Sequence, residues 1–187
     1  MRKIIAGMNM TLDGVCDHTE GVADDELHQH YEELLLNSGV ILYGRTTFEL
    51  MKYWQDLAEK PGGDPVMDDF AKAMDSVPKV VFSRTLHDTA WHSATLATRS
   101  LKEEAIALRE QPGKDILVGS RSLIVQLLNL GLVDEFQLSV HPIIAGKGLA
   151  LFDQISDKVM LKLSKTKTFG SGVVTFFYEI LEKKDGR

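Results

Sequence analysis

The chain has 187 residues, of which 44% are hydrophobic and 26% are charged, and these proportions exclude a disordered, collagen-like or coiled-coil protein. Its 21 basic and 27 acidic residues give a net charge of −6, so no global field attracts nucleic acid or an anionic membrane surface. One cysteine excludes an intramolecular disulfide and a cysteine-rich zinc site, and we expect no metal. The length fits a single domain over residues 1–187. Because no apolar run reaches the roughly 18–20 residues that span a bilayer, we expect this domain to be cytoplasmic.

Four short apolar runs predict strands that are buried on both faces, as in a largely parallel sheet. They are residues 4–6, 40–43, 80–82 and 116–118. Between them, apolar residues recur at spacings of three and four, which predicts helices with one apolar stripe each. These helices cover residues 27–35, 48–54, 101–108 and 123–130. Alternating strands and helices predict an α/β fold, and the glycine- and proline-rich residues 59–65 predict a surface loop.

The last third of the chain has a different pattern. Apolar and polar residues alternate over 136–141 and again over 158–163, and Gly170-Ser171-Gly172 then precedes the apolar residues 173–181. This pattern predicts a β-hairpin added antiparallel at an edge of the sheet. The expected architecture is therefore a mixed, mostly parallel central sheet, flanked by helices, with a C-terminal antiparallel β-hairpin.

Small residues, hydroxyls and one arginine follow three of the buried runs. They are Gly44-Arg45-Thr46-Thr47, Ser83-Arg84-Thr85 and Gly119-Ser120-Arg121-Ser122. In an open α/β sheet, ligands bind beyond the carboxyl ends of the strands. Backbone N–H groups at a helix start and arginine guanidinium groups both bind phosphate oxygens. Any one of these segments could be an ordinary helix cap or surface charge. If the three strands are neighbours, however, the segments form one anion-binding rim.

These segments, in this order, resemble the dihydrofolate reductase-like superfamily. The resemblance is to the C-terminal reductase domain of the bifunctional deaminase-reductase of riboflavin biosynthesis and its stand-alone relatives. It rests on Met10-Thr11-Leu12-Asp13-Gly14, on residues 40–49, on residues 79–84, on residues 115–148 and on the final strand 177–181. The resemblance implies a three-layer dihydrofolate reductase-like fold and a stand-alone domain without a fused deaminase.

The resemblance also implies NADPH as hydride donor to a small heterocyclic substrate. The implied phosphate-binding residues are Gly44, Arg45, Thr46 and Thr47, with Gly119, Ser120, Arg121 and Ser122 around the pyrophosphate and Ser83 and Arg84 at the 2′-phosphate. The model reaction is the reduction of 5-amino-6-(5-phosphoribosylamino)uracil. A dihydrofolate reductase and a non-catalytic nucleotide-binding protein are the alternatives.

Three residues are candidates on the substrate side. Asp13 lies in a tight turn after the first strand and is the candidate catalytic acid, although aspartate often caps its own turn. Asn9 flanks the same place, and His28 stands where dihydrofolate reductases carry a helical carboxylate. The resemblance further implies a homodimer, for which the apolar residues 173–181 are a candidate interface if the molecule's own helices do not cover them.

Overall fold

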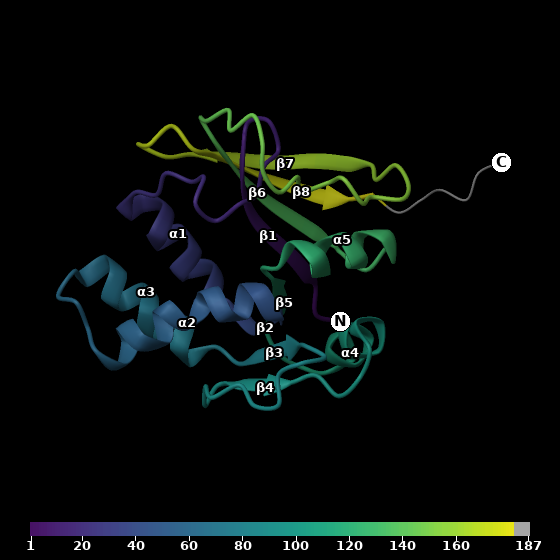
Figure 1. Ribbon diagram of the computed structural model, residues 1–187. Coiled ribbons are helices and arrows are strands. Elements are labelled where there is room, and N and C mark those ends of the chain that lie inside the picture. The colour runs from purple at the N-terminus through teal and green to yellow at the C-terminus, as the bar shows by residue number, and fades with distance from the viewer. Residues whose placement is uncertain (182–187) are drawn as a thin grey trace.

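The computed structural model describes residues 1–181, in which the strands form one eight-stranded sheet of order β4-β3-β2-β5-β1-β6-β8-β7 (Figure 1). The strands are β1 (Ile4–Thr11), β2 (Ser38–Gly44), β3 (Lys79–Phe82), β4 (Ala94–Leu96), β5 (Asp115–Val118), β6 (Glu135–His141), β7 (Leu161–Thr168) and β8 (Val174–Ile180). The helices are α1 (Asp25–Leu36), α2 (Arg45–Glu59), α3 (Pro65–Ser76), α4 (Leu101–Glu110) and α5 (Arg121–Asn129).

Every adjacent pair of strands from β4 to β6 is parallel, whereas β8 runs antiparallel to β6 and β7 antiparallel to β8. This arrangement confirms the mixed, mostly parallel sheet with a C-terminal hairpin. It also brings the carboxyl ends of β3, β2, β5, β1 and β6 to the same edge of the sheet.

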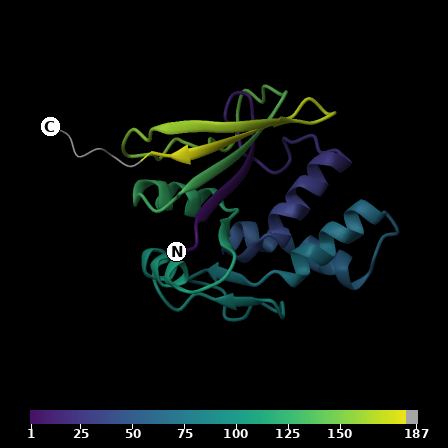
Figure 2. The same cartoon turned by 180° about the vertical axis from the view of Figure 1, so that it is seen from behind.

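Helices cover both faces of the sheet, and the strands divide their side chains between them. Alternate residues of a strand point to opposite faces, so Ile4 and Ala6 of β1 join the core under α4 and α5. Ile5, between them, joins the core with Phe48 of α2 and Phe70 of α3. Figure 1 and Figure 2 show α1, α2 and α3 on one side and α4 and α5 on the other, which gives three layers.

Two elements were not predicted from the sequence. The expected loop 59–65 is confined to residues 60–64, because Asp64 caps α3 and Pro65 occupies its first turn. Proline fits there because a backbone N–H at the first helical position has no partner within the helix. In α3, Met67, Phe70, Ala71 and Met74 recur at helical spacing, so its apolar stripe was present in the sequence although the helix was not predicted. Strand β4 has only three residues, which is too short for a periodic pattern.

The buried lysine Lys79 ties these elements together. Its ammonium group donates to the carbonyl oxygens of Met74 and Val77 and to Ser93 Oγ, and it lies 4.1 Å from the centre of the Trp91 ring. Burial lowers the Lys79 pKa to about 8. A buried charge persists only when its donors are satisfied, and here the lysine joins the end of α3 to β3 and to the segment before β4.

The C-terminal hairpin lies at the edge of the sheet, but its apolar strand is not the edge. β8 pairs with β6 on one side and with β7 on the other, so β7 is the outer strand and all eight of its residues are exposed. The apolar residues 173–181, named as a candidate interface, are therefore paired on both sides, by β6 and by the polar strand β7. Among residues 1–181, no helix is both long and apolar enough to cross a membrane.

Candidate functional site

The three polar segments singled out in the sequence meet at one edge of the sheet. They follow β3, β2 and β5, which are adjacent and parallel. The condition for a single rim is thus met by the strand order. The turn after β1 and the end of β6 lie at the same edge, on the other side of β5. We call the segments 44–47, 83–84 and 119–122 the anion rim.

Two segments of the anion rim touch each other directly. The backbone N–H of Gly44 donates to Ser120 Oγ over 2.9 Å. A Cβ at Gly44 would lie 3.3 Å from Ser122 Oγ, so glycine at this position keeps the two segments close together. A Cβ at Gly119 would lie 3.0 Å from Cε1 of the buried Tyr43 ring, so glycine at that position leaves room for the core.

The helices that begin at the anion rim differ from the other three at their N-termini. Asp24, Asp64 and Ser100 cap α1, α3 and α4 with their side chains, and each of these helices has an acidic residue in its first turn. By contrast, α2 and α5 have no capping side-chain bond and no acidic residue in the first turn. Their partial positive charge is therefore not offset by a cap or by a carboxylate of the first turn, which favours an anion at this place.

The arginines of the anion rim do not share one environment. Arg45 and Arg84 are exposed, and within residues 1–181 neither makes an ion pair. Arg121, in contrast, donates from Nε to the carbonyl oxygen of Ala150 over 2.6 Å and pairs with Asp153. Its guanidinium holds the loop after β6, so only its backbone N–H remains on the rim. The Ser83 hydroxyl accepts from the backbone N–H groups of its own turn, at residues 85 and 86.

Asp13 joins two loops at the carboxyl edge of the sheet. Its carboxylate accepts hydrogen bonds from the Thr11 hydroxyl over 2.5 Å and from the N–H groups of Ala145 and Gly146 over 3.1 and 2.7 Å. The bonds from Thr11, Gly146 and Ala145 lower the Asp13 pKa to about 2. The carboxylate therefore has no proton to give near neutral pH. These contacts favour the turn-holding alternative over the expected catalytic role.

A polar cluster lies beside this turn, between α1 and the ends of β1 and β6. Asn9 Oδ1 lies 3.0 Å from both the Tyr31 hydroxyl and His141 Nε2. The Tyr31 hydroxyl is also 2.9 Å from Ser139 Oγ, which is 2.7 Å from Thr175 Oγ1. Asn9 is exposed, whereas the cluster residues on β6 and β8 are buried. The Asn9 amide is therefore the group of the cluster that a ligand can reach, and its hydrogen bonds to the other residues hold it in place.

Hydrogen bonds fix the position of the ring proton of His141 and the orientation of the Asn9 amide. His141 Nδ1 accepts from the backbone N–H of Val22 over 3.0 Å, so a neutral ring carries its proton on Nε2 and donates to Asn9. Burial lowers the pKa of His141, which favours that neutral form. Since Asn9 Oδ1 then accepts, Asn9 Nδ2 is the group left to donate to a ligand.

Helix α1 presents Tyr31 to the sheet, and His28 lies elsewhere. The His28 ring contacts Trp54 of α2 and Phe70 of α3, with ring centres 6.2 and 5.8 Å apart. Its Nδ1 lies 3.1 Å from the carbonyl oxygen of Asp24, within its own helix. The placement of His28 thus does not support the expected substrate contact. Sequence reasoning missed Tyr31 because a tyrosine at helical spacing looks like any core residue; the alternating polar residues at the ends of β1 and β6 were the available signal.

The acidic residues at the start of α1 have structural partners as well. Asp24 accepts from the N–H groups of Leu27 and Ser171, and Glu26 accepts from that of Gly170. Asp24 caps α1, and both carboxylates hold the turn between β7 and β8. They are turned to that hairpin and not to the polar cluster.

Comparison with known proteins places this architecture in a family. Residues 2–175 match the family described as RibD C-terminal domain. The chain belongs to the RibD C-terminal domain family. This confirms the resemblance seen in the sequence, and it supports a reductase-like function of the kind found in the riboflavin pathway.

Relatives of the RibD C-terminal domain family resemble the chain over its length. The chain is 37% identical over 181 residues to the uncharacterized protein YyaP of Bacillus subtilis (strain 168), covering 95% of this chain and 94% of YyaP. A putative riboflavin biosynthesis protein from Shewanella sp. PV-4 has the same fold, with a TM-score of 0.74, 16% identity and coverage of 96% and 99%.

A third relative is larger than this chain. The diaminohydroxyphosphoribosylaminopyrimidine deaminase/5-amino-6-(5-phosphoribosylamino)uracil reductase of Thermotoga maritima has a TM-score of 0.65 and 18% identity, over 96% of this chain and 57% of that protein. At this level of identity the likeness shows the fold alone. It confirms that a RibD reductase-like fold is present.

Proposed function

We propose that the protein is an NADPH-dependent reductase of a small heterocyclic substrate. The observation that carries the proposal is the anion rim, where two uncapped helices and two unpaired arginines gather at the carboxyl edge of three adjacent parallel strands. Membership of the RibD C-terminal domain family supports the reductase chemistry.

The residues of the anion rim fit a dinucleotide phosphate. The backbone N–H groups at the starts of α2 and α5 would bind the pyrophosphate, because neither helix has a capping side-chain hydrogen bond. Arg45 would bind a phosphate oxygen, and Arg84, after β3, would bind the 2′-phosphate that distinguishes NADPH from NADH. Thr46, Thr47 and Ser122 would add hydroxyl donors.

When bound, NADPH supplies a hydride, and the chain itself needs only to position and orient the reactants. Asn9 would donate from Nδ2 to a carbonyl oxygen of the substrate, with its amide orientation held by Tyr31 and His141. The Asp13 carboxylate would keep the two loops at this edge in place. No side chain of the polar cluster is a strong acid, since burial raises the Tyr31 pKa to about 12, so we propose that water delivers the proton.

The substrate we propose first is 5-amino-6-(5-phosphoribosylamino)uracil, whose ribosylamino group would be reduced to ribitylamino. The name of the Thermotoga protein includes this reductase activity, and a pyrimidinedione has carbonyl oxygens that would accept from the Asn9 amide. Dihydrofolate is less well supported, because α1 turns Tyr31 toward the sheet while Asp24 and Glu26 serve the hairpin turn.

The test is a titration with NADPH followed by measurement of its absorbance with each substrate. We expect NADPH to bind and to be oxidised by the pyrimidine substrate. Arg84→Ala should weaken NADPH about tenfold or more, as a lost charge-assisted contact does, while changing NADH affinity little. Arg45→Ala should weaken both dinucleotides.

Lys162→Ala is the matched control, because Lys162 on β7 is an exposed cation that pairs with Glu179, and β7 lies at the far side of the sheet from β3. Binding of NADPH with no oxidation by any substrate would instead indicate a nucleotide-binding protein without turnover. Oxidation by dihydrofolate alone would indicate a dihydrofolate reductase. Unchanged NADPH affinity in Arg45→Ala and Arg84→Ala would refute the assignment of the rim.

A further inference from the structure

A cavity lies away from the anion rim, toward the amino ends of the strands. Its volume is about 500 Å³, within the range of small-molecule sites. Its walls are α1, the first residues of β2 and β5, and the face of β1, β6, β8 and β7 that α1 covers. Since the anion rim is at the opposite ends of β2 and β5, this cavity is separate from the proposed cofactor site.

Two buried polar atoms of residues that line this cavity have no hydrogen-bond partner among residues 1–181. They are His30 Nε2 and Gln137 Oε1, on side chains that are 8% and 7% exposed. Leaving such an atom without a partner costs about 1–3 kcal/mol. A ligand that forms hydrogen bonds with these two atoms would recover that free energy.

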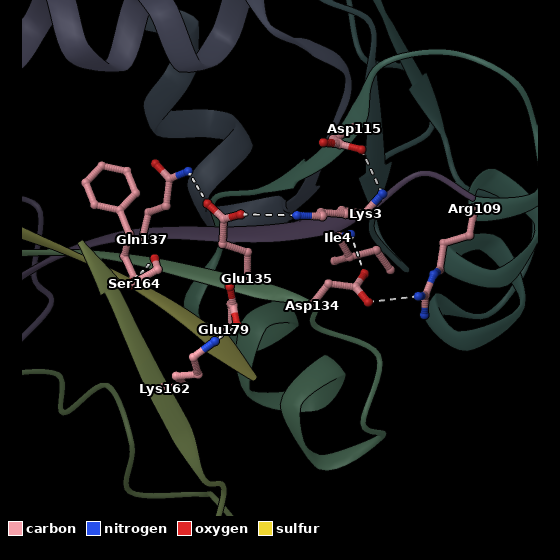
Figure 3. A network of polar contacts seen from close by, with 11 residues as sticks. Lys3, Ile4, Arg109, Asp115, Asp134, Glu135, Gln137, Lys162, Ser164 and Glu179 are labelled. Atoms are coloured by element: carbon pink, nitrogen blue, oxygen red, sulfur yellow. Dashed lines mark hydrogen bonds and ion pairs between the residues drawn. The ribbon is translucent and has the colours of Figure 1, made fainter. Parts of the chain in front are cut away.

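The orientation of the Gln137 amide is set by its neighbours. Its nitrogen donates to Glu135 Oε1 over 2.9 Å, and Glu135 is paired with Lys3. Figure 3 shows this chain of contacts and the Gln137 carbonyl oxygen on the side away from Glu135. A flip of the amide would put two acceptors together, so Gln137 offers the cavity an acceptor only.

The charges around the cavity are separated by sign. Lys165 and Lys167 lie on β7, and the Lys165 ammonium stays 4.2 Å from the centre of the Phe177 ring. Glu33 on α1 and Asp115 at the start of β5 form the opposite, acidic side. Asp115 already accepts from the backbone N–H of Lys3 over 2.7 Å, whereas Glu33 is exposed.

His30 adds no charge to the cavity near neutral pH. Its ring packs against Tyr31, Phe169 and Phe177, with centres 5.4 to 5.8 Å apart. Burial, together with the charges of Lys167 and Lys165, lowers its pKa to about 4. The neutral ring has one N–H and one lone pair and can serve either end of a polar ligand.

We propose that this cavity binds a small zwitterion with an apolar side chain, that is, an apolar α-amino acid. Its carboxylate lies toward Lys165 and Lys167, and its ammonium donates to Gln137 Oε1 on the side of Glu33 and Asp115. Its side chain packs on Leu34 and Phe177. A phosphate or other multiply charged anion is disfavoured, because the two carboxylates would repel it.

Calorimetric titration with L-leucine tests the proposal, with isocaproate and isoamylamine as analogues that lack the amino group or the carboxylate. We expect leucine to bind and each analogue to bind at least about tenfold more weakly, the size of one lost hydrogen bond to a charged group. NADPH affinity, measured separately, tests the anion rim independently of this result.

Two variants locate the binding. Gln137→Met removes the acceptor at similar volume, and the double variant Lys165→Ala/Lys167→Ala removes the cationic side on an exposed strand. Each should weaken leucine about tenfold or more. Lys162→Ala, on the same strand but outside the cavity, should leave leucine affinity unchanged.

Three outcomes would overturn the proposal. They are no binding of leucine at millimolar concentration, equal binding of leucine and either analogue, and unchanged leucine affinity in the double lysine variant. The double variant decides the question if Gln137→Met does not fold, because the two lysines are exposed.

Discussion

At the scale of single residues, hydrogen bonds decide what each candidate side chain can do. Asp13 looked like an acid beside a substrate site, yet it accepts bonds from three donors on two loops. Arg121 looked like a phosphate ligand, yet its guanidinium holds Ala150 and Asp153. In both cases the charge is used to hold a loop at the edge of the site.

The Asp13 clamp predicts a dependence of stability on pH. The folded pKa of about 2 lies below the ordinary value of 3.8, so the contribution of Asp13 is fully present above pH 3.8 and is lost as pH falls toward 2. Asp13→Asn should therefore be less stable than wild type at neutral pH, and the difference should shrink over that window. Urea unfolding at a series of pH values measures it.

Asp56→Asn is the control for this prediction, because Asp56 is an exposed carboxylate on α2 outside the clamp. Amide hydrogen exchange at Ala145 and Gly146 should also speed up in Asp13→Asn. Equal stability of Asp13→Asn and wild type at neutral pH would show that the clamp contributes nothing.

At the scale of secondary-structure elements, the helix starts separate structural from functional roles. Ser100 forms a capping box with Glu103 at the start of α4, where its hydroxyl accepts from the Glu103 N–H. Ser120 stands at the same position of α5 but accepts from Gly44 of a different segment. One serine completes its helix, and the other joins two helices at the anion rim.

This contrast predicts that two similar serine substitutions affect different properties, the stability in one case and the NADPH affinity in the other. Ser100→Ala should lower the free energy of unfolding by about 1 kcal/mol, the typical value of a lost cap, and leave NADPH affinity unchanged. Ser120→Ala should lower NADPH affinity several-fold, because the segments 44–47 and 119–122 lose their direct bond. Denaturant unfolding and NADPH titration on both variants measure the two effects. An equal loss of NADPH affinity in both variants would contradict the assigned roles.

At the scale of the whole molecule, the last strand of the sheet, β7, pairs with β8 on one side and with no other strand among residues 1–181. All residues of β7 are exposed, with Leu161 and Leu163 at 39% and 50%, and an edge of this kind pairs readily with another chain. We propose that the homodimer implied by the family resemblance uses β7 and not the apolar β8, which is already paired on both sides.

Light scattering tests this proposal. The wild-type protein should have the mass of a dimer, and Leu163→Glu should have the mass of a monomer at the same concentration, because a charge at the interface is not desolvated cheaply. Lys158→Glu, a charge reversal in the exposed loop before β7, should remain dimeric. A wild-type protein with the mass of a monomer would refute the dimer.

Much of the fold was predictable because burial leaves a local pattern. Four of the parallel strands were visible as apolar runs, and the hairpin was visible as alternation around Gly170-Ser171-Gly172. Strand β4 was not predictable, since a three-residue strand carries little periodic signal, whereas α3 was missed although its apolar residues recur at helical spacing. In the candidate site, the three polar segments were predictable because each directly follows a buried strand.

The sequence by itself determined which segments are strands and helices and which polar residues stand at strand ends, because these features depend on neighbours a few positions away. Only the tertiary structure decided that β3, β2 and β5 are adjacent, that α1 turns Tyr31 and not His28 to the sheet, and that Arg121 faces Asp153. Each of these depends on contacts between residues far apart in the chain. Strand order and helix rotation are set by how whole elements pack, and no local pattern contains that information.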